Sequence, residues 1–563
     1  MGVLGLKSFL EREKQTRTIN IVNEINKWIS EHGTAPSIII DLNNLIISHS
    51  KLEYDTLCGG RNRSALESFE KFLKVLSAIE NISLIFFCGL TIQKDKVAEW
   101  LSRRNQEFNS YTSLYYLIND GKNIDAAIAD NKLLNSTLLG METIAKKYGD
   151  FHYTVKVECD LEIAKYAKNN DVMAVISNNM DFLLFDGLWR LWSSDDIRIT
   201  AANQLKTTEY ERNIAQICKL KSYQLPLFGT LLGNDFTMKF YDNLVDFHNS
   251  LGPIMYKIRC VARYVRNVGN VELCDDDIEE ISMKVFGNAD CNKKQLIRTS
   301  VNSYNVDVSP TTDDDPLEKK LFHTDMYRSY AVNMSTIQGI NLPFYDMRGC
   351  RHDANLTTIL ADWMKRRIGI LRQHNQNNSF TFTLLAMMDA EEEFEAHFAK
   401  PIYPDFPVPA LDTFYIENEI TEINWKMLGW IMSLSDTELA LIRKLPKDFL
   451  VISSTLYILV KKGLIGAEEA DGILYTEKIV RNSETIDMKY PTGFESKCVR
   501  AAHIYNITYS HVQENFAIAG LLSLVQDSIL QFDGVYYQKL MEDFAKINPT
   551  ERSNAIKDYR IYA

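Results

Sequence analysis

The chain has 563 residues, of which 46% are hydrophobic and 11% aromatic, and its formal net charge is -12. These values exclude a largely disordered polypeptide and predict two or three domains, because a single core rarely serves more than about 300 residues. Since phosphates are bound by Lys and Arg, the negative charge confines any nucleic-acid contact to a local basic part of the surface.

The cysteines predict an internal location. All nine are scattered without a CxxC pair, which favours reduced thiols over disulfides or a zinc module. No apolar run has the length of a membrane span, and the opening MGVLGLKSFLEREK turns charged too early for a secretory signal. We therefore expect an intracellular protein without a membrane partner, with a nuclear location favoured over a cytoplasmic one.

Strands and helices alternate along residues 1–240, which we expect to form the first domain. Apolar runs predict strands at 37–42, 82–87, 155–157 and 172–177, and helical periodicity predicts helices at 19–32, 64–80, 158–169 and within 92–148. Ser64 and Glu67 have the spacing of a capping box. This alternation is typical of an α/β fold in which helices flank a mostly parallel sheet.

Helical spacing dominates the remainder of the chain. Residues 241–320 are predicted to form a helical extension with an acidic linker (SPTTDDDP), and residues 321–563 a mainly helical domain. Its helical stretches are predicted at 354–373, 381–400 and 424–464. We expect this domain to pack on the first one and to bind any protein partners.

Five carboxylates follow predicted strands or begin turns: Asp41, Glu158, Asp160, Asp181 and Asp235. Each has a structural explanation taken singly, as a helix cap or a strand end. The carboxyl ends of parallel strands meet at one crevice, however, so these acids can converge. Converged carboxylates repel one another unless a cation compensates, and oxygen ligands suit Mg²⁺ or Mn²⁺. Together they predict a metal-dependent phosphoryl-transfer site.

Five motifs occur in a fixed order: MGVLGL, IIIDLNNLI, VECDLEIAKYA, SNNMDFLLF and LLGND. They resemble the motifs of the XPG and flap-endonuclease superfamily, and the phrase PLFGTLLGN most resembles the Asteroid family and the related constitutive coactivators of PPAR-gamma. The resemblance covers residues 1–240 and implies a PIN-like sheet. It also implies that the five acids, with Asn179 as a further ligand, hold one or two Mg²⁺ or Mn²⁺ ions for two-metal phosphodiester hydrolysis.

Two positions depart from the superfamily pattern. Cys88 stands where active members have an Asp, and a thiol is a poor ligand for a hard ion. Asn179 replaces the first Asp of a D-x-D pair, so it can coordinate a metal without adding negative charge. The glycine-rich hairpin that grips duplex DNA in those nucleases is also missing after Asp235.

A basic segment follows Cys88, where the nucleases carry a helix that contacts the scissile phosphate. Its members are Lys94, Lys96, Arg103 and Arg104. Lys96 and Arg103 are seven residues apart, so on one helix they share a face. The alternative interpretation is a solvated surface paired with Glu99 and Glu107.

Two functions remain open from the sequence. The first is a Mg²⁺- or Mn²⁺-dependent endonuclease, or a nucleic-acid-binding protein of the nuclease fold, that acts on branched or single-stranded DNA or RNA. The second is a catalytically degenerate scaffold for signalling or transcriptional coactivation, which the substitutions at Cys88 and Asn179 favour.

Overall fold

The structure is a computed structural model. It describes residues 2–45, 52–129, 137–200, 204–268, 273–307, 315–341, 355–375, 380–388, 393–417, 419–482, 490–491, 493–543 and 549–562. Most of the predicted acidic linker lies outside these residues. Within them, no helix is both long and apolar enough to cross a membrane.

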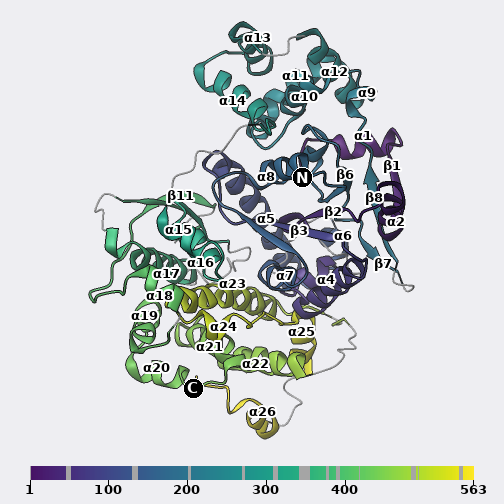
Figure 1. Ribbon diagram of the computed structural model, residues 1–563. Coiled ribbons are helices and arrows are strands. Elements are labelled where there is room, and N and C mark those ends of the chain that lie inside the picture. Colours follow the sequence, from purple (N-terminus) through teal and green to yellow (C-terminus); the bar gives the residue numbers. More distant parts are fainter. Residues whose placement is uncertain are drawn as a thin grey trace.

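A sheet of eight strands organises the N-terminal part of the chain (Figure 1). The strands are β1 (Thr16–Asn20), β2 (Ser37–Asp41), β3 (Ser83–Gly89), β4 (Asp150–Thr154), β5 (Ala174–Ile176), β6 (Arg190–Trp192), β7 (Arg198–Ile199) and β8 (Leu205–Tyr210). Their order is β1-β8-β6-β5-β2-β3-β4, with β7 on β8. The strands from β6 to β4 are parallel, and β1 and β6 pair with β8 antiparallel. The predicted mostly parallel sheet is confirmed.

Helices cover both faces of this sheet, which explains why its central strands are apolar throughout. In β2, Ile38 and Ile40 belong to one hydrophobic cluster and Ile39 to another, because successive side chains point to opposite faces. One face is covered by α2 (Ile21–His32), α4 (Asn62–Ser77) and α7 (Leu138–Ala145), and the other by α1 (Leu6–Arg12), α8 (Cys159–Asn169) and α10 (Leu225–Leu232).

The helical extension shares the core of the first region. Its helices α11 (Tyr241–Leu251), α12 (Lys257–Val268), α13 (Asp275–Phe286) and α14 (Cys291–Asn302) form the upper lobe in Figure 1. Leu244, Val261 and Ile297 join the same buried cluster as the residues of α1 and α8. The extension therefore forms one packed body with the sheet.

The rest of the first region consists of short helices and one long one: α3 (Leu52–Leu57), α5 (Val97–Asn119), α6 (Asp125–Ala129) and α9 (Ile214–Ile217). The long helix α5 confirms the prediction of a helix within 92–148. It runs between the sheet region and the C-terminal helices, so both regions contact it (Figure 1).

The C-terminal region is mainly helical, as predicted. It contains α15 (Pro316–Leu321), α16 (Tyr327–Met334), α17 (Asn355–Leu371), α18 (Leu411–Glu417), α19 (Glu422–Met432), α20 (Asp436–Ile442), α21 (Leu450–Lys461), α22 (Ala467–Asn482), α23 (Ser496–Ile518), α24 (Leu522–Val525), α25 (Gly534–Asp543) and α26 (Pro549–Ile556). The helical predictions at 354–373 and 424–464 are confirmed by α17 and by α19 to α21.

The predicted helix at 381–400 is wrong. This segment contains two strands, β10 (Phe382–Ala386) and β11 (Glu395–Ala399), which pair antiparallel. On its other side β10 pairs with β9 (Ile337–Gly339). The apolar run in β10 is short enough to fit either a helix or a strand, and partners on both edges decide for the strand.

Two local predictions near the site are also wrong. The fourth strand is β4, which ends at Thr154, so residues 155–157 lie in a bend. Helix α4 begins at Asn62 without a side-chain cap, and Glu67 accepts from Arg63 instead of closing a capping box with Ser64. Residues 225–232 form helix α10, and Asp235 lies in the turn that follows it.

Candidate metal centre

Asp41 stands at the carboxyl end of the central strand β2 and is only 1% exposed. Its Oδ2 accepts hydrogen bonds from Asn44 Nδ2 and Ser177 Oγ, both at 2.7 Å. Its Oδ1 is buried and has no partner among the described residues. Burial raises the pKa of this carboxyl, and the hydrogen bonds only partly offset that effect.

Glu158 and Asp160 lie at the start of α8, where Glu158 is the residue that precedes the first turn. Glu158 Oε1 lies 3.6 Å from Lys96 Nζ. Asp160 Oδ2 accepts from Asn179 Nδ2 at 2.6 Å. Burial, together with the charges of Asp41 and Glu158, raises the pKa of Asp160 well above its usual range.

Asn179 and Asp181 follow the neighbouring strand β5. The Asn179 amide oxygen accepts from the Asp181 backbone N–H at 3.0 Å. Gly2 packs directly on this amide with a φ of 95°, and a Cβ there would lie 2.2 Å from Asn179 Oδ1. This contact explains a glycine after the first residue. The Tyr304 hydroxyl donates to Asp181 Oδ1 at 3.1 Å, and burial raises the pKa of Asp181 to about 6.

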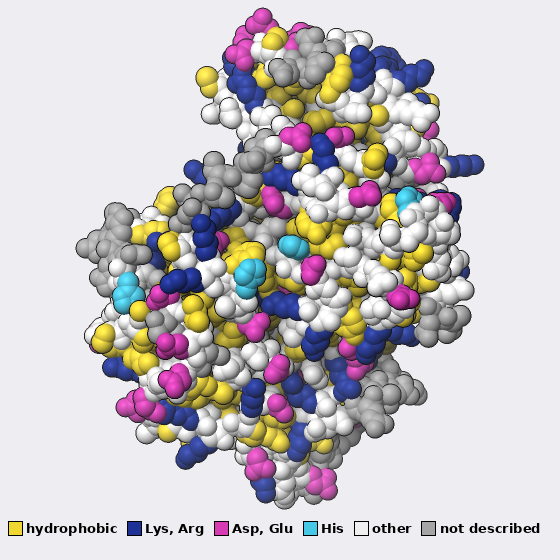
Figure 2. Space-filling view, in the orientation of Figure 1, with side chains coloured by type: hydrophobic (Ala, Val, Ile, Leu, Met, Phe, Trp, Pro, Cys, Tyr) yellow, Lys and Arg dark blue, Asp and Glu magenta, His cyan; other side chains and the backbone are white. Residues whose placement is uncertain are grey.

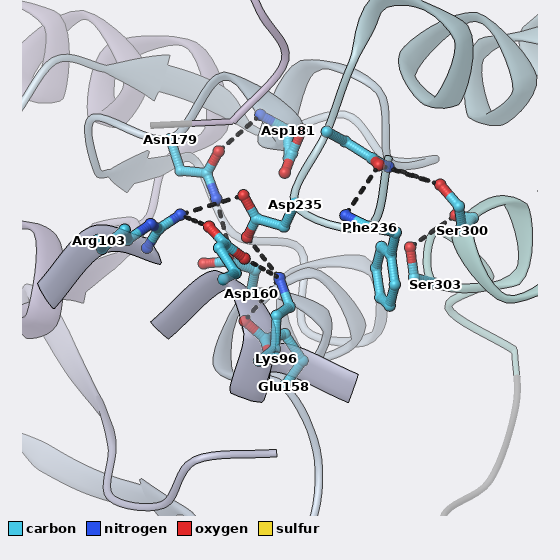
Figure 3. Close-up of polar contacts among 12 residues, drawn as sticks. Lys96, Arg103, Glu158, Asp160, Asn179, Asp181, Asp235, Phe236, Ser300 and Ser303 are labelled. Atoms are coloured by element: carbon cyan, nitrogen blue, oxygen red, sulfur yellow. Dashed lines mark hydrogen bonds and ion pairs between the residues drawn. The ribbon is translucent and has the colours of Figure 1, made fainter. Parts of the chain in front are cut away.

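Asp235 follows α10 and meets two cations (Figure 3). Lys96 Nζ forms an ion pair with its Oδ2, and Arg103 lies 3.1 Å from its Oδ1. Burial by itself would raise the pKa of Asp235, but these two cations lower it below its usual value. Burial likewise opposes the charge of Lys96, and the neighbouring acids nevertheless raise the Lys96 pKa well above its ordinary value.

The four predicted basic residues have different surroundings. Lys96 and Arg103 face the acids, and each also pairs with Glu99. Lys94 is exposed. Arg104 is mostly buried and pairs with Glu107 at 2.6 Å.

Two adjoining cavities contain all five predicted acids. The first has a volume of about 320 Å³ and is lined by Asp41 and Asn179, among others. The second, of about 390 Å³, is lined by Asp181 and Tyr304. Glu158, Asp160, Asp235 and Lys96 line both. We call these two cavities the carboxylate pocket.

The acids of this pocket are separated by cationic and amide groups. Lys96 stands between Glu158 and Asp235, and Asn179 bridges Asp160 to the loop of Asp181. In this arrangement no three acids, histidines or cysteines of the described residues are grouped to hold a metal ion. The oxygen ligands nevertheless suit a hard cation, and the unpartnered Asp41 Oδ1 offers one a buried ligand.

Cys88 does not belong to the carboxylate pocket. Its buried thiol lies 3.5 Å from Glu142 Oε1, and burial raises the pKa of the thiol well above its usual value. Glu142 in turn accepts from Tyr153 and from Arg328 of the C-terminal region, at 3.1 and 2.9 Å. Sequence patterns do not predict the roles of Glu142, Arg328 and Tyr304, because their partners lie far away along the chain.

One segment of the chain matches a known family of domains. Residues 218–308, which span α10 to α14 and include Asp235, match the FAM120A-like domain family. The constitutive coactivator of peroxisome proliferator-activated receptor gamma from Bos taurus is 24% identical over 246 residues, covering 42% of this chain and 33% of the coactivator. The Homo sapiens coactivator is 24% identical over 250 residues, covering 42% and 26%.

The matched region spans a third or less of the length of these coactivators. The predicted resemblance to the coactivators is nevertheless confirmed. Among solved structures, the Rad2 catalytic core with a DNA substrate is 15% identical, with a TM-score of 0.30, and covers 57% of this chain and 92% of that one. The Holliday junction-resolving enzyme GEN1 with product DNA, Mg²⁺ and Mn²⁺ is 14% identical, with a TM-score of 0.29, covering 57% and 64%.

Proposed function

We propose that this protein binds one Mg²⁺ or Mn²⁺ ion in the carboxylate pocket and hydrolyses phosphodiesters of branched or single-stranded nucleic acid. The observation that carries this proposal is Asp41 Oδ1, a buried acceptor without a partner among the described residues, in a pocket that also contains Asp160. A buried carboxylate oxygen left unpaired is costly, and a cation removes that cost.

The charge balance of the pocket supports a bound cation. Five acids share the two cations Lys96 and Arg103, and Glu99 competes for both. Lys96 pairs with Asp235 and Glu158, and Arg103 pairs with Asp235. Burial is the largest cause of the raised pKa values of Asp41, Asp160 and Asp181, and the charges of neighbouring acids raise those of Asp160 and Asp181 further.

The residues divide the chemical roles between them. Asp41 and Asp160, with the amide oxygen of Asn179, would hold the ion. When bound, the ion would lower the pKa of a water molecule and polarise a phosphoryl oxygen. Lys96 keeps a positive charge beside Asp235 and Glu158, and Arg103 extends that positive edge towards solvent. We therefore assign to Lys96 and Arg103 the binding and orientation of the phosphate.

The test is a calorimetric titration of the pure protein with Mn²⁺, followed by cleavage assays on flap, overhang and single-stranded substrates. Asp41→Ala and Asp160→Ala should each abolish ion binding and cleavage. Glu162→Gln is the matched control, because Glu162 lies one residue beyond the pocket on α8 and pairs with Lys165. Absence of both heat and cleavage in the wild type would reject the proposal.

A second candidate is a scaffold that keeps the fold without catalysis, and the packing of α5 favours it. Phe108 packs on Met387 and Phe394, and Tyr111 packs on His503, so the C-terminal region covers one side of the helix next to the pocket. On the face shown in Figure 2, basic and acidic side chains are interspersed. Under this proposal the C-terminal region binds protein partners in the nucleus, and the titration above yields no heat.

A further inference from the structure

A cavity of about 470 Å³ lies between the sheet region and the C-terminal region. The sheet region contributes Thr91, Ile92 and Trp100, and the C-terminal region contributes Arg367 of α17 and Asn506 of α23. The volume is within the range of about 300–1,000 Å³ that is usual for small-molecule sites. We call it the interdomain cavity.

The interdomain cavity adjoins the carboxylate pocket. Thr91, Ile92 and Trp100 line both of them. A ligand that has one group at the carboxylate pocket can therefore extend past Trp100 into the interdomain cavity. Gly339 forms part of the wall, and a Cβ at this position would lie 2.8 Å from the Trp100 ring and 3.1 Å from Ile92. Only a glycine leaves the indole in place.

Unpartnered hydrogen-bond acceptors line this cavity. Asn506 is 5% exposed, and its Nδ2 donates to the Gly59 carbonyl at 2.6 Å, which fixes the orientation of the amide. Its Oδ1 is buried and has no partner among the described residues, and the same is true of Asn341 Oδ1. These two oxygens favour a ligand that carries N–H or O–H donors.

The charged groups around the cavity balance one another. Arg328 lies 3.3 Å from Glu514 and 2.9 Å from Glu142. Arg367 donates to neutral oxygens, those of Asn333 and Asn515, both at 2.8 Å. Two cations thus accompany two carboxylates, so the cavity has no excess positive charge for a phosphate. A flat, uncharged ligand with polar edges suits it better.

We propose that the interdomain cavity receives the base of an unpaired nucleotide whose phosphate lies at the carboxylate pocket. The base stacks on Trp100 and donates from an amino or ring N–H group to Asn506 Oδ1. This inference rests on the proposed function, since it places a nucleic-acid strand at the carboxylate pocket. It adds a requirement for an unpaired base next to the phosphate that is bound.

The test uses the full chain in EDTA, so that base binding is measured without a metal ion. Cytidine and adenosine are titrated by saturation-transfer NMR, with inorganic phosphate as a second probe. A single-stranded oligonucleotide is then compared with the same strand carrying one abasic site. We expect binding of both nucleosides, no competition between phosphate and the nucleosides, and roughly tenfold weaker binding when the base that enters the cavity is absent.

Ser510→Trp fills the cavity from α23, because Ser510 lines it. Ser113→Trp is the matched control: Ser113 is also an exposed helical serine that donates to the carbonyl four residues earlier. We expect Ser510→Trp to weaken nucleoside binding about tenfold or more and Ser113→Trp to leave it unchanged. Val332→Phe, at a second lining position, should have the same effect as Ser510→Trp.

Two results would overturn the inference: no nucleoside binding by the wild type, or equal binding by the wild type and both cavity-filling variants. Either result with Mn²⁺ binding intact leaves the proposed function in place. Conversely, nucleoside binding without Mn²⁺ binding would reject the proposed hydrolysis and keep the base site.

Discussion

Buried acids have different surroundings in the two halves of this molecule. In the C-terminal region Glu477 is fully buried, and it accepts from Arg481 at 3.2 Å and from Tyr505 at 2.8 Å. In the carboxylate pocket the buried carboxylates of Asp41 and Asp181 accept, from the described residues, only hydrogen bonds of neutral donors: Asn44, Ser177 and Tyr304. Burial raises the pKa of all three carboxyls, but Arg481 offsets part of that cost at Glu477, whereas Asp41 and Asp181 form no ion pair with any described residue. Under the proposed function, this contrast separates structural acids from acids held for a ligand.

The largest expected effect is that of breaking the ion pair between Arg481 and Glu477. Arg481→Met leaves the Glu477 carboxylate buried without its cation, and we expect it to lower the free energy of unfolding by about 3–5 kcal/mol. Urea unfolding measures this loss. Lys27→Met is the control, because Lys27 and Glu31 form an exposed pair at 3.9 Å, for which a change within ~0.5 kcal/mol is expected. Equal effects of the two variants would remove the contrast.

A substitution in the carboxylate pocket should raise the free energy of unfolding instead of lowering it. Asp181 has its pKa raised to about 6, so its charged form destabilises the folded state. Asp181→Asn keeps the oxygen that accepts from Tyr304, and we expect it to raise the free energy of unfolding by about 1–3 kcal/mol at pH 8 in EDTA.

The pH dependence of the stability gained by Asp181→Asn follows from the raised pKa of Asp181. The folded wild type binds the proton more tightly than the unfolded chain, so its stability falls as pH rises towards and through about 6. The gain from Asp181→Asn should therefore disappear at pH 4, where the wild-type carboxyl is protonated when folded. Unfolding curves at both pH values test this, and a gain that persists at pH 4 would contradict it.

Lowering the pH should destabilise the folded protein through a histidine of the C-terminal region, which is the opposite of its effect through Asp181. His503 is buried against the Leu57 carbonyl, and burial lowers its pKa to about 4. Because the unfolded imidazole titrates near 6.5, this contribution to stability is present above that value and is lost as pH falls towards 4. We expect a loss of about 2 kcal/mol at pH 5 relative to pH 8, measured by thermal unfolding. A His503→Gln variant should lack this part of the acid sensitivity.

The smallest expected effect concerns the cation that the pocket already contains. Lys96→Met removes a positive charge next to Asp235 and Glu158, and we expect Mn²⁺ affinity to rise about tenfold because one repulsive charge is lost. Affinity for single-stranded nucleic acid should fall in the same variant. Lys94→Met is the control, since Lys94 is exposed two residues away. Unchanged Mn²⁺ affinity in Lys96→Met would show that Lys96 and the ion do not share the pocket.

The sequence predicted the centre of the sheet well. The run 37–42 is apolar and β-branched, it ends in an acid, and it became the central strand with Asp41 at its end. Such runs are predictable because both faces of a parallel strand are buried. The helix predicted at 381–400 is wrong because the apolar segment there is short and fits either a helix or a strand. Only the pairing of β10 with β9 and β11 decides for a strand.

The amino-acid sequence by itself determined that Asp41 ends one core strand and that Asp181 follows another, because strand-forming runs and their ends are local properties. Tertiary structure alone decided which groups surround these acids: Lys96 pairs with Asp235, and Asn179 donates to Asp160. It also decided that the C-terminal region closes a second cavity beside Trp100. These contacts join residues far apart along the chain, and the energy of a buried charge depends on which neighbours the fold brings to it.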